Sequence, residues 1–362
     1  MTSASSPSKS SARNLLQSLP YPLALLVLRA LNSKSAPERH HSAYYLAECA
    51  LKLAAAARVG VWLERAGISG DKEDKPATFD KDIARRLEAL VLPSAGHWCE
   101  ILREVSRNLA ERKDAALVPL APETRDLSRT PSTWTAIRAF AERAIEEECI
   151  PPDASRQSLR RGALGFFDIV VAYRNEVIGH GAQRSNAFYE ALGELLLAAT
   201  CEVLSSPALF AGMELVHARF AHETSSDEPK VRFQGLTGPA TMPMDTSASG
   251  ALAGRLYLVG PAGRICLHPL VVLQQDDEFG RDRIGFLNRT IRRTKKGSDA
   301  GVEEIRRVDY LDYASGQALV GVDARAAMAD LLGKLRGKPI AEADHEAATE
   351  ATLSGSSPDP ND

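Results

Sequence analysis

The segment LRRGALGFFDIVVAYRNEVIGHG, residues 159–181, carries the strongest indication of the fold. Its apolar side chains recur every three to four positions, which predicts a helix with one buried face, from about residue 155 to 178. The stripe consists of Leu159, Phe166, Val170, Tyr173 and Val177. Gly179 can end this helix in a left-handed turn. Arg174 would then lie at the edge of the buried stripe, and His180 just past the helix end.

The end of this segment, Tyr173-Arg-Asn-Glu-Val-Ile-Gly-His-Gly181, resembles the signature of HEPN domains, in which an arginine is followed after four to six residues by a histidine. Arg174 and His180 enclose five residues and are the one pair in the sequence with this spacing. Asn175 after the arginine and Gly181 after the histidine also match. The resemblance covers about residues 36–206. It implies a helical bundle in which the motif joins the last two long helices.

The resemblance also implies an activity. Active HEPN domains are metal-independent endoribonucleases in which two protomers place their motifs face to face, in bacterial antiviral defence or toxin–antitoxin systems. By this resemblance His180 would transfer protons, and Arg174 would hold the scissile phosphate. Asn175 would orient the histidine or contact the phosphate. The expected products are 2′,3′-cyclic phosphate and 5′-hydroxyl ends, with RNA as substrate and with no metal or cofactor.

A non-catalytic interpretation stays open beside this one. Arg174 can pair with a nearby carboxylate such as Asp168 or Glu176, and His180 can cap its own helix end. The chain would then be a HEPN-like dimerisation and binding module of a signalling or defence system. In HEPN proteins paired with a nucleotidyltransferase antitoxin, a tyrosine often stands two residues after the histidine. Here that position is Ala182, so this form of regulation is not expected.

Helical patterns dominate residues 13–210, the part of the chain that contains the motif. Ser35 and Glu38 form a capping box that predicts a long helix over 36–66, with Gly67 as its end. Glu48 on this helix is expected to pair with Lys52. The resemblance to HEPN domains implies that Glu48 faces the same cleft as Arg174. His40 and His41 point about 100° apart on a helix, so a solvated helix start is favoured over a metal pair. Further helices are predicted over 81–92, 96–113, 134–149 and 186–204.

The pattern changes after residue 210. The stretch 211–252 has no periodicity and is interpreted as a linker. Strands with period two follow, and a last helix is predicted over 324–336. The strand candidates are 255–259, 264–273, 284–290 and 307–313. We therefore expect a mainly α protein, in which the bundle is followed by a small α+β domain, 253–340, rich in β-hairpins and able to bind a protein partner. The serine-rich tail 1–12 and the acidic tail 341–362 are predicted to be disordered.

A basic run lies between Arg281 and Arg307, with nine Lys or Arg against four Asp or Glu, a net of +5. The basic side chains at the centre of this run can bind RNA phosphates. The residues are Arg289, Arg292, Arg293, Lys295 and Lys296. The alternative is a solvated hairpin loop between two strands.

Composition excludes several classes of protein. Of 362 residues, 44% are hydrophobic and 25% are charged, and the net charge is −3. These values exclude a fully disordered or collagen-like chain and a strong overall attraction to nucleic acid or anionic membranes. The five cysteines are scattered without CxxC spacing, which argues against a disulfide framework or a zinc knuckle. With no signal peptide or membrane-spanning segment recognised, a cytoplasmic protein is expected.

Overall fold

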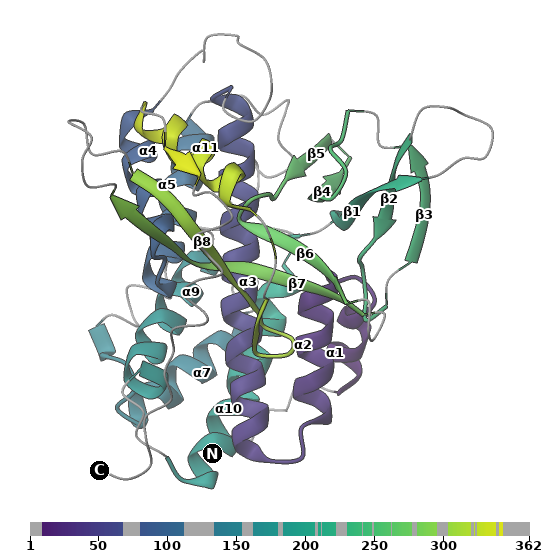
Figure 1. Cartoon of the computed structure of the whole chain (residues 1–362). Helices are drawn as coiled ribbons and strands as arrows, with labels where there is room; N and C mark the ends of the chain where they lie inside the picture. Colours follow the sequence, from purple (N-terminus) through teal and green to yellow (C-terminus); the bar gives the residue numbers. More distant parts are fainter. Residues whose placement is uncertain are drawn as a thin grey trace, which may run out of the picture.

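The chain folds into a mainly helical body that carries two β-sheets (Figure 1). The computed structural model describes residues 9–67, 80–111, 134–153, 162–179, 184–206, 209–210, 212–221, 230–240, 242–247, 250–261, 263–276, 281–294, 303–319, 322, 324–337 and 340–342. Within these ranges, none of the helices has the length and hydropathy that a membrane crossing requires.

The long helix α3 is the centre of the helical part and packs against α2, α5, α9 and α10. The helices are α1 (Lys9–Leu16), α2 (Tyr21–Asn32), α3 (Ala36–Arg65), α4 (Lys81–Leu87), α5 (Ala95–Glu111), α7 (Thr135–Glu146), α9 (Gly162–Tyr173), α10 (Asn186–Leu204) and α11 (Arg325–Arg336), with the 3-10 turn η1 (Glu88–Val91) and the π-helix η3 (Arg174–Gly179). Ser35 caps α3 as predicted, because its hydroxyl accepts the backbone N–H of Glu38. Gly67 ends the helix at a φ of 66°.

Within the residues that the structure describes, ten strands form two sheets. They are β1 (Glu214–Ala221), β2 (Lys230–Gly235), β3 (Met242–Ser247), β4 (Leu256–Gly260), β5 (Gly263–Cys266), β6 (Val271–Asp276), β7 (Arg281–Thr294), β8 (Glu303–Asp312), β9 (Gln317–Leu319) and β10 (Ala341–Glu342). The first sheet has the order β3-β2-β1-β4-β5, and the second has the order β10-β8-β7-β6 with β9 also paired to β8. Antiparallel hairpins predominate, as expected for the C-terminal part.

The prediction of a linker over 211–252 is wrong, since β1, β2 and β3 lie within it. Val216 and Ala218 of β1 are fully buried, so this segment is stabilised by pairing with β2 and β4 and by burial. Its sequence lacks a clear alternation because both faces of β1 are covered in part.

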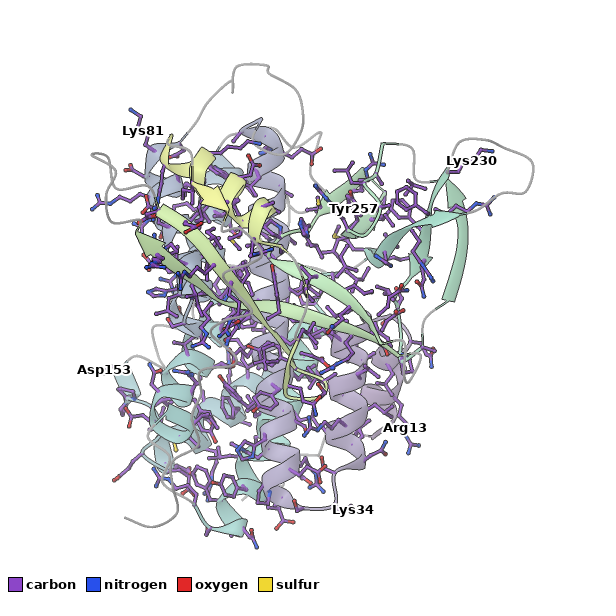
Figure 2. All side chains as sticks on the ribbon, in the orientation of Figure 1. Arg13, Lys34, Lys81, Asp153, Lys230 and Tyr257 are labelled. Atoms are coloured by element: carbon purple, nitrogen blue, oxygen red, sulfur yellow. The ribbon has the colours of Figure 1, made fainter. Side chains whose placement is uncertain are left out.

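The helices and the second sheet share one hydrophobic core. Figure 1 shows β6, β7 and β8 crossing α3, and Figure 2 shows side chains filling the space between them. One continuous buried cluster contains Trp62 of α3, Phe166 of α9, and Phe286 and Tyr310 of the sheet. The C-terminal part is therefore packed onto the helices rather than around a separate core of its own. A smaller cluster around Phe233 lies within the first sheet.

The N-terminal tail also differs from expectation. Residues 9–12 belong to helix α1, because Ala12 and Leu16 pack into the shared core. Residues 1–8 of the tail 1–12, and 343–362 of the tail 341–362, lie outside the described residues.

Candidate functional site

The arginine of the motif begins a change of helical geometry. The chain is α-helical up to Tyr173 and continues as the π-helix η3 from Arg174 to Gly179. The prediction of a left-handed turn at Gly179 is wrong, because this residue closes the π-helix without a positive φ. A π-helical turn holds one more residue per hydrogen-bonded ring than an α-helix, and such turns occur frequently at functional sites.

Tyr173 anchors the backbone next to Arg174. Its hydroxyl lies 2.7 Å from Nε2 of His40, and its ring packs edge-on against Phe140 at 5.3 Å. Both Tyr173 and His40 are fully buried, so the prediction of a solvated helix start at His40 is wrong. Burial, and then the charge of His41, lower the pKa of His40 to about 4. His40 is therefore a neutral hydrogen-bond partner at neutral pH.

This burial predicts that the protein loses stability in mild acid. The folded pKa of His40 is about 4 against 6.5 when unfolded, and burial lowers the pKa of His268 similarly. Between these pH values the unfolded chain binds more protons than the folded chain. The free energy of unfolding is therefore unaffected by these histidines above pH 6.5 and decreases as the pH falls toward 4. For His40 the loss is about 3 kcal/mol, to be measured by urea unfolding from pH 7.5 to 4.

Two variants test whether His40 causes this loss of stability in acid. His40→Gln keeps a partner for the Tyr173 hydroxyl but does not titrate, so its free energy of unfolding is expected to depend less on pH. His97→Gln alters an exposed histidine of α5 and is expected to retain the wild-type dependence. An unchanged pH dependence in His40→Gln would contradict the burial of His40.

Arg174 is partly buried, and its guanidinium is not neutralised by a carboxylate within the described part of the chain. Its Nη1 lies 3.5 Å from Oδ1 of Asn175. Asp168, which the sequence offered as a partner, forms an ion pair with Arg103 of α5 instead. Glu176 is exposed. Neither carboxylate that the sequence offered is therefore seen to pair with Arg174.

Tyr44, Glu48 and Lys52 form a polar cluster on α3, in which burial lowers the pKa of Lys52 and the charge of Arg174 lowers the pKa of Tyr44 and of Lys52. Tyr44 donates a hydrogen bond to Oε2 of Glu48, and Lys52 lies 3.7 Å from Oε1 of the same carboxylate. Burial and Glu48 raise the pKa of Tyr44, whereas Arg174, as a positive charge and a hydrogen-bond donor, lowers it. The predicted pair of Glu48 and Lys52 is thus confirmed.

The other predicted site residues are placed as follows. Asn175 is exposed beside Arg174, and His180 lies outside the described residues. In the basic run, Arg289 pairs with Asp309, and Nη1 of Arg292 lies 3.0 Å from Oε2 of Glu303.

Three further residues of the basic run are predicted to contact RNA, namely Arg293, Lys295 and Lys296. Arg293 is exposed, whereas Lys295 and Lys296 lie outside the described residues. Two of the five predicted RNA contacts are therefore engaged with the neighbouring strand β8, which favours a paired hairpin over a free basic patch.

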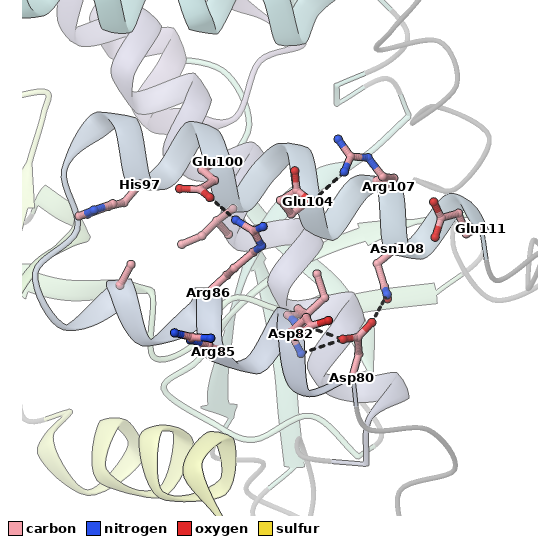
Figure 3. Close-up of a pocket in the computed structure, with 13 residues that line it drawn as sticks. Asp80, Asp82, Arg85, Arg86, His97, Glu100, Glu104, Arg107, Asn108 and Glu111 are labelled. Carbon is pink, nitrogen blue, oxygen red and sulfur yellow. Dashed lines mark hydrogen bonds and ion pairs between the residues drawn. The ribbon is translucent and has the colours of Figure 1, made fainter.

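A separate surface groove of about 810 Å³ lies between α4 and α5 (Figure 3). Two ion pairs lie within the lining, Arg86 with Glu100 and Arg107 with Glu104. Neither Arg174 nor Asn175 lines it. Among the residues that the structure describes, no group of three or more His, Cys, Asp or Glu is arranged to bind a metal ion.

Sequence reasoning missed Tyr44 and Tyr313, which both donate to Glu48. Tyr44 precedes Glu48 by four residues, a spacing that places both side chains on one helix face and could have revealed it. Tyr313 is 265 residues away and gives no local signal. Comparison of the chain with protein-family models, with curated proteins and with solved structures found no match.

Proposed function

We propose that the protein is a metal-independent endoribonuclease of the HEPN type, acting as a homodimer in bacterial defence or toxin-like RNA cleavage. The observation that carries the proposal is the position of Arg174 together with its lack of an ion-pair partner among the described residues. Arg174 stands at the first position of a π-helical turn, on an anchored backbone, and its partly buried side chain forms no ion pair with a carboxylate of the described residues. Such an arginine is suited to bind an RNA phosphate.

Each motif residue has a distinct role in the proposed reaction. Arg174 holds the phosphate through its planar fork and stabilises the negative charge that develops on it. His180 assists attack of the ribose 2′-hydroxyl on the adjacent phosphate, or protonates the leaving 5′-oxygen. The P–O5′ bond breaks as the bond from O2′ to phosphorus forms, which leaves a 2′,3′-cyclic phosphate and a 5′-hydroxyl. Asn175 supplies an amide beside the guanidinium.

The proposal is tested by incubating the purified chain with total RNA in the presence of EDTA. The expected result is cleavage that leaves 5′-hydroxyl ends, while a DNA oligonucleotide of the same sequence as an RNA substrate is left intact because it lacks the 2′-hydroxyl. Cleavage that EDTA abolishes, or that leaves 5′-phosphate ends, would overturn the proposed reaction.

A second candidate function is a non-catalytic dimerisation and binding module. It is favoured by the contact of Arg174 with Tyr44, since a side chain already engaged with a buried cluster can serve stability alone. In that case no RNA is cut, and Arg174 variants alter only the free energy of unfolding.

A further inference from the structure

Tyr173 connects the motif to a histidine that is distant in the sequence. Tyr173 is the last residue of α9, so its peptide bond leads directly into Arg174 and the π-helix η3. Its hydroxyl lies 2.7 Å from Nε2 of His40 on α3, 133 positions away in the chain. Both side chains are fully buried. The hydrogen bond therefore joins α3 to the point at which the geometry of the motif helix changes.

The close packing of α10 holds His40 in place. Gly193 of α10 approaches so closely that a Cβ at this residue would lie 3.1 Å from Cα and 3.2 Å from N of His40. The ring of Tyr189, on the same helix, has its centroid 5.1 Å from that of the His40 ring. Because packed groups of this kind do not move independently, the imidazole offers Tyr173 a fixed partner.

The imidazole of His40 has a single hydrogen bond among the described residues. Its Nδ1 is buried and has no partner there, so the bond between Nε2 and the Tyr173 hydroxyl is the one that holds the ring. Breaking this bond would leave buried polar groups unpaired on both sides, which costs more free energy than an average hydrogen bond contributes. The bond therefore keeps the Tyr173 hydroxyl at one point.

The change to a π-helix makes the position of Tyr173 important for the motif. In a π-helix each hydrogen bond spans one residue more than in an α-helix, so the side chains that follow point in different directions than along a continued α-helix. Tyr173 and Val177 are both buried, whereas Arg174 between them is only partly buried. The residue at which α9 gives way to η3 therefore decides which way the motif arginine faces.

We propose that His40 is a positioning residue, whose hydrogen bond to Tyr173 fixes where the α-helix ends and the π-helix begins. It thereby sets the direction in which Arg174 and Asn175 leave the backbone. This action runs through the covalent chain and needs no contact between His40 and the motif side chains. Its effect on RNA cleavage rests on the proposed function, whereas its effect on the backbone of η3 does not.

The test uses the full-length protein and two variants that lack the bond. His40→Leu leaves the Tyr173 hydroxyl without this partner and is expected to be less stable. In the double variant His40→Leu/Tyr173→Phe both polar groups are replaced by apolar ones of similar size, which restores most of the stability but not the bond. The control is Tyr310→Phe, which removes another buried hydroxyl, donated to the Pro269 carbonyl at 2.8 Å in the second sheet.

Two readouts separate positioning from stability. The first is the set of ¹³Cα chemical shifts from Arg174 to Gly179, which report on backbone torsion angles, and the second is kcat/KM for an RNA oligonucleotide in EDTA. We expect the chemical shifts to change alike in the single and the double variant and to stay in place in Tyr310→Phe. We also expect kcat/KM to fall about tenfold in both His40 variants and to change less than about twofold in the control.

Each contrary result decides a different point. Wild-type chemical shifts in the double variant, or equal changes in Tyr310→Phe, would overturn the positioning role of His40. Changed chemical shifts with a wild-type kcat/KM would overturn the link from His40 to cleavage. Absence of cleavage by the wild type would overturn the proposed function alone, because the chemical shifts still report on the backbone of η3.

Discussion

Replacing Arg174 by alanine is expected to reduce RNA cleavage at least about 100-fold, because the transition-state charge on the phosphate loses its main hydrogen-bond donor. Arg174→Lys keeps the positive charge but not the planar fork, so most of the loss is expected there as well. His180→Ala is expected to lose at least as much, since it removes the proton-transfer group. The measurement is the initial rate of cleavage of an RNA oligonucleotide in EDTA.

A matched control is Arg138→Ala, which removes an exposed arginine of α7 and should leave the rate unchanged. Because Arg174 also contacts a buried cluster, the melting temperature of each variant is measured in parallel. A folded Arg174→Ala protein that cleaves as fast as the wild type would refute the site assignment. Equal cleavage by the wild type, Arg174→Ala and His180→Ala would indicate a contaminating nuclease.

The helices were predictable because their signals are local. Ser35 and Gly67 mark the two ends of α3 within a few residues of where the chain changes conformation. The predicted helix over 186–204 coincides with α10, capped by Ser185. In each case the capping residue and the apolar spacing lie in one continuous stretch, so no knowledge of the tertiary structure is needed.

The strands were harder to predict because their partners are distant. The expected single strand over 264–273 is in fact β5 and β6, which belong to different sheets and are separated by a turn at Leu267–Leu270. The strand candidate 307–313 corresponds to the second half of β8, which pairs with β7 on one side and with β9 and β10 on the other. Pairing of this kind is set by tertiary contacts that a local pattern does not encode.

The residues of the candidate site also fall into two groups, those that a local sequence pattern predicts and those that only the tertiary structure reveals. Arg174 and Asn175 follow from a short motif, and Glu48 from an i,i+4 pair on one helix. The hydrogen bond from Tyr313 to Glu48 depends on how the second sheet packs on α3, which no local pattern indicates.

The packing of the first sheet on the helices is tested at Gly60, where α3 meets β5. A Cβ at this position would lie 2.4 Å from the Cys266 carbonyl oxygen and 2.8 Å from Cγ2 of Ile265. The carbonyl belongs to a paired strand and cannot move without disturbing β4. Gly60→Ala is therefore expected to lower the free energy of unfolding by about 3 kcal/mol, measured by urea denaturation, although alanine favours a helix intrinsically.

Gly96→Ala in α5 is the matched control, because its Cβ would meet Ser94 and Val171 only at 3.6 and 3.8 Å, an ordinary contact. The same substitution should therefore be neutral there or stabilise by up to about 1 kcal/mol. If Gly60→Ala were as stable as the wild type, the C-terminal strands would not pack this closely on α3. The close approach of β5 to α3 would then be wrong.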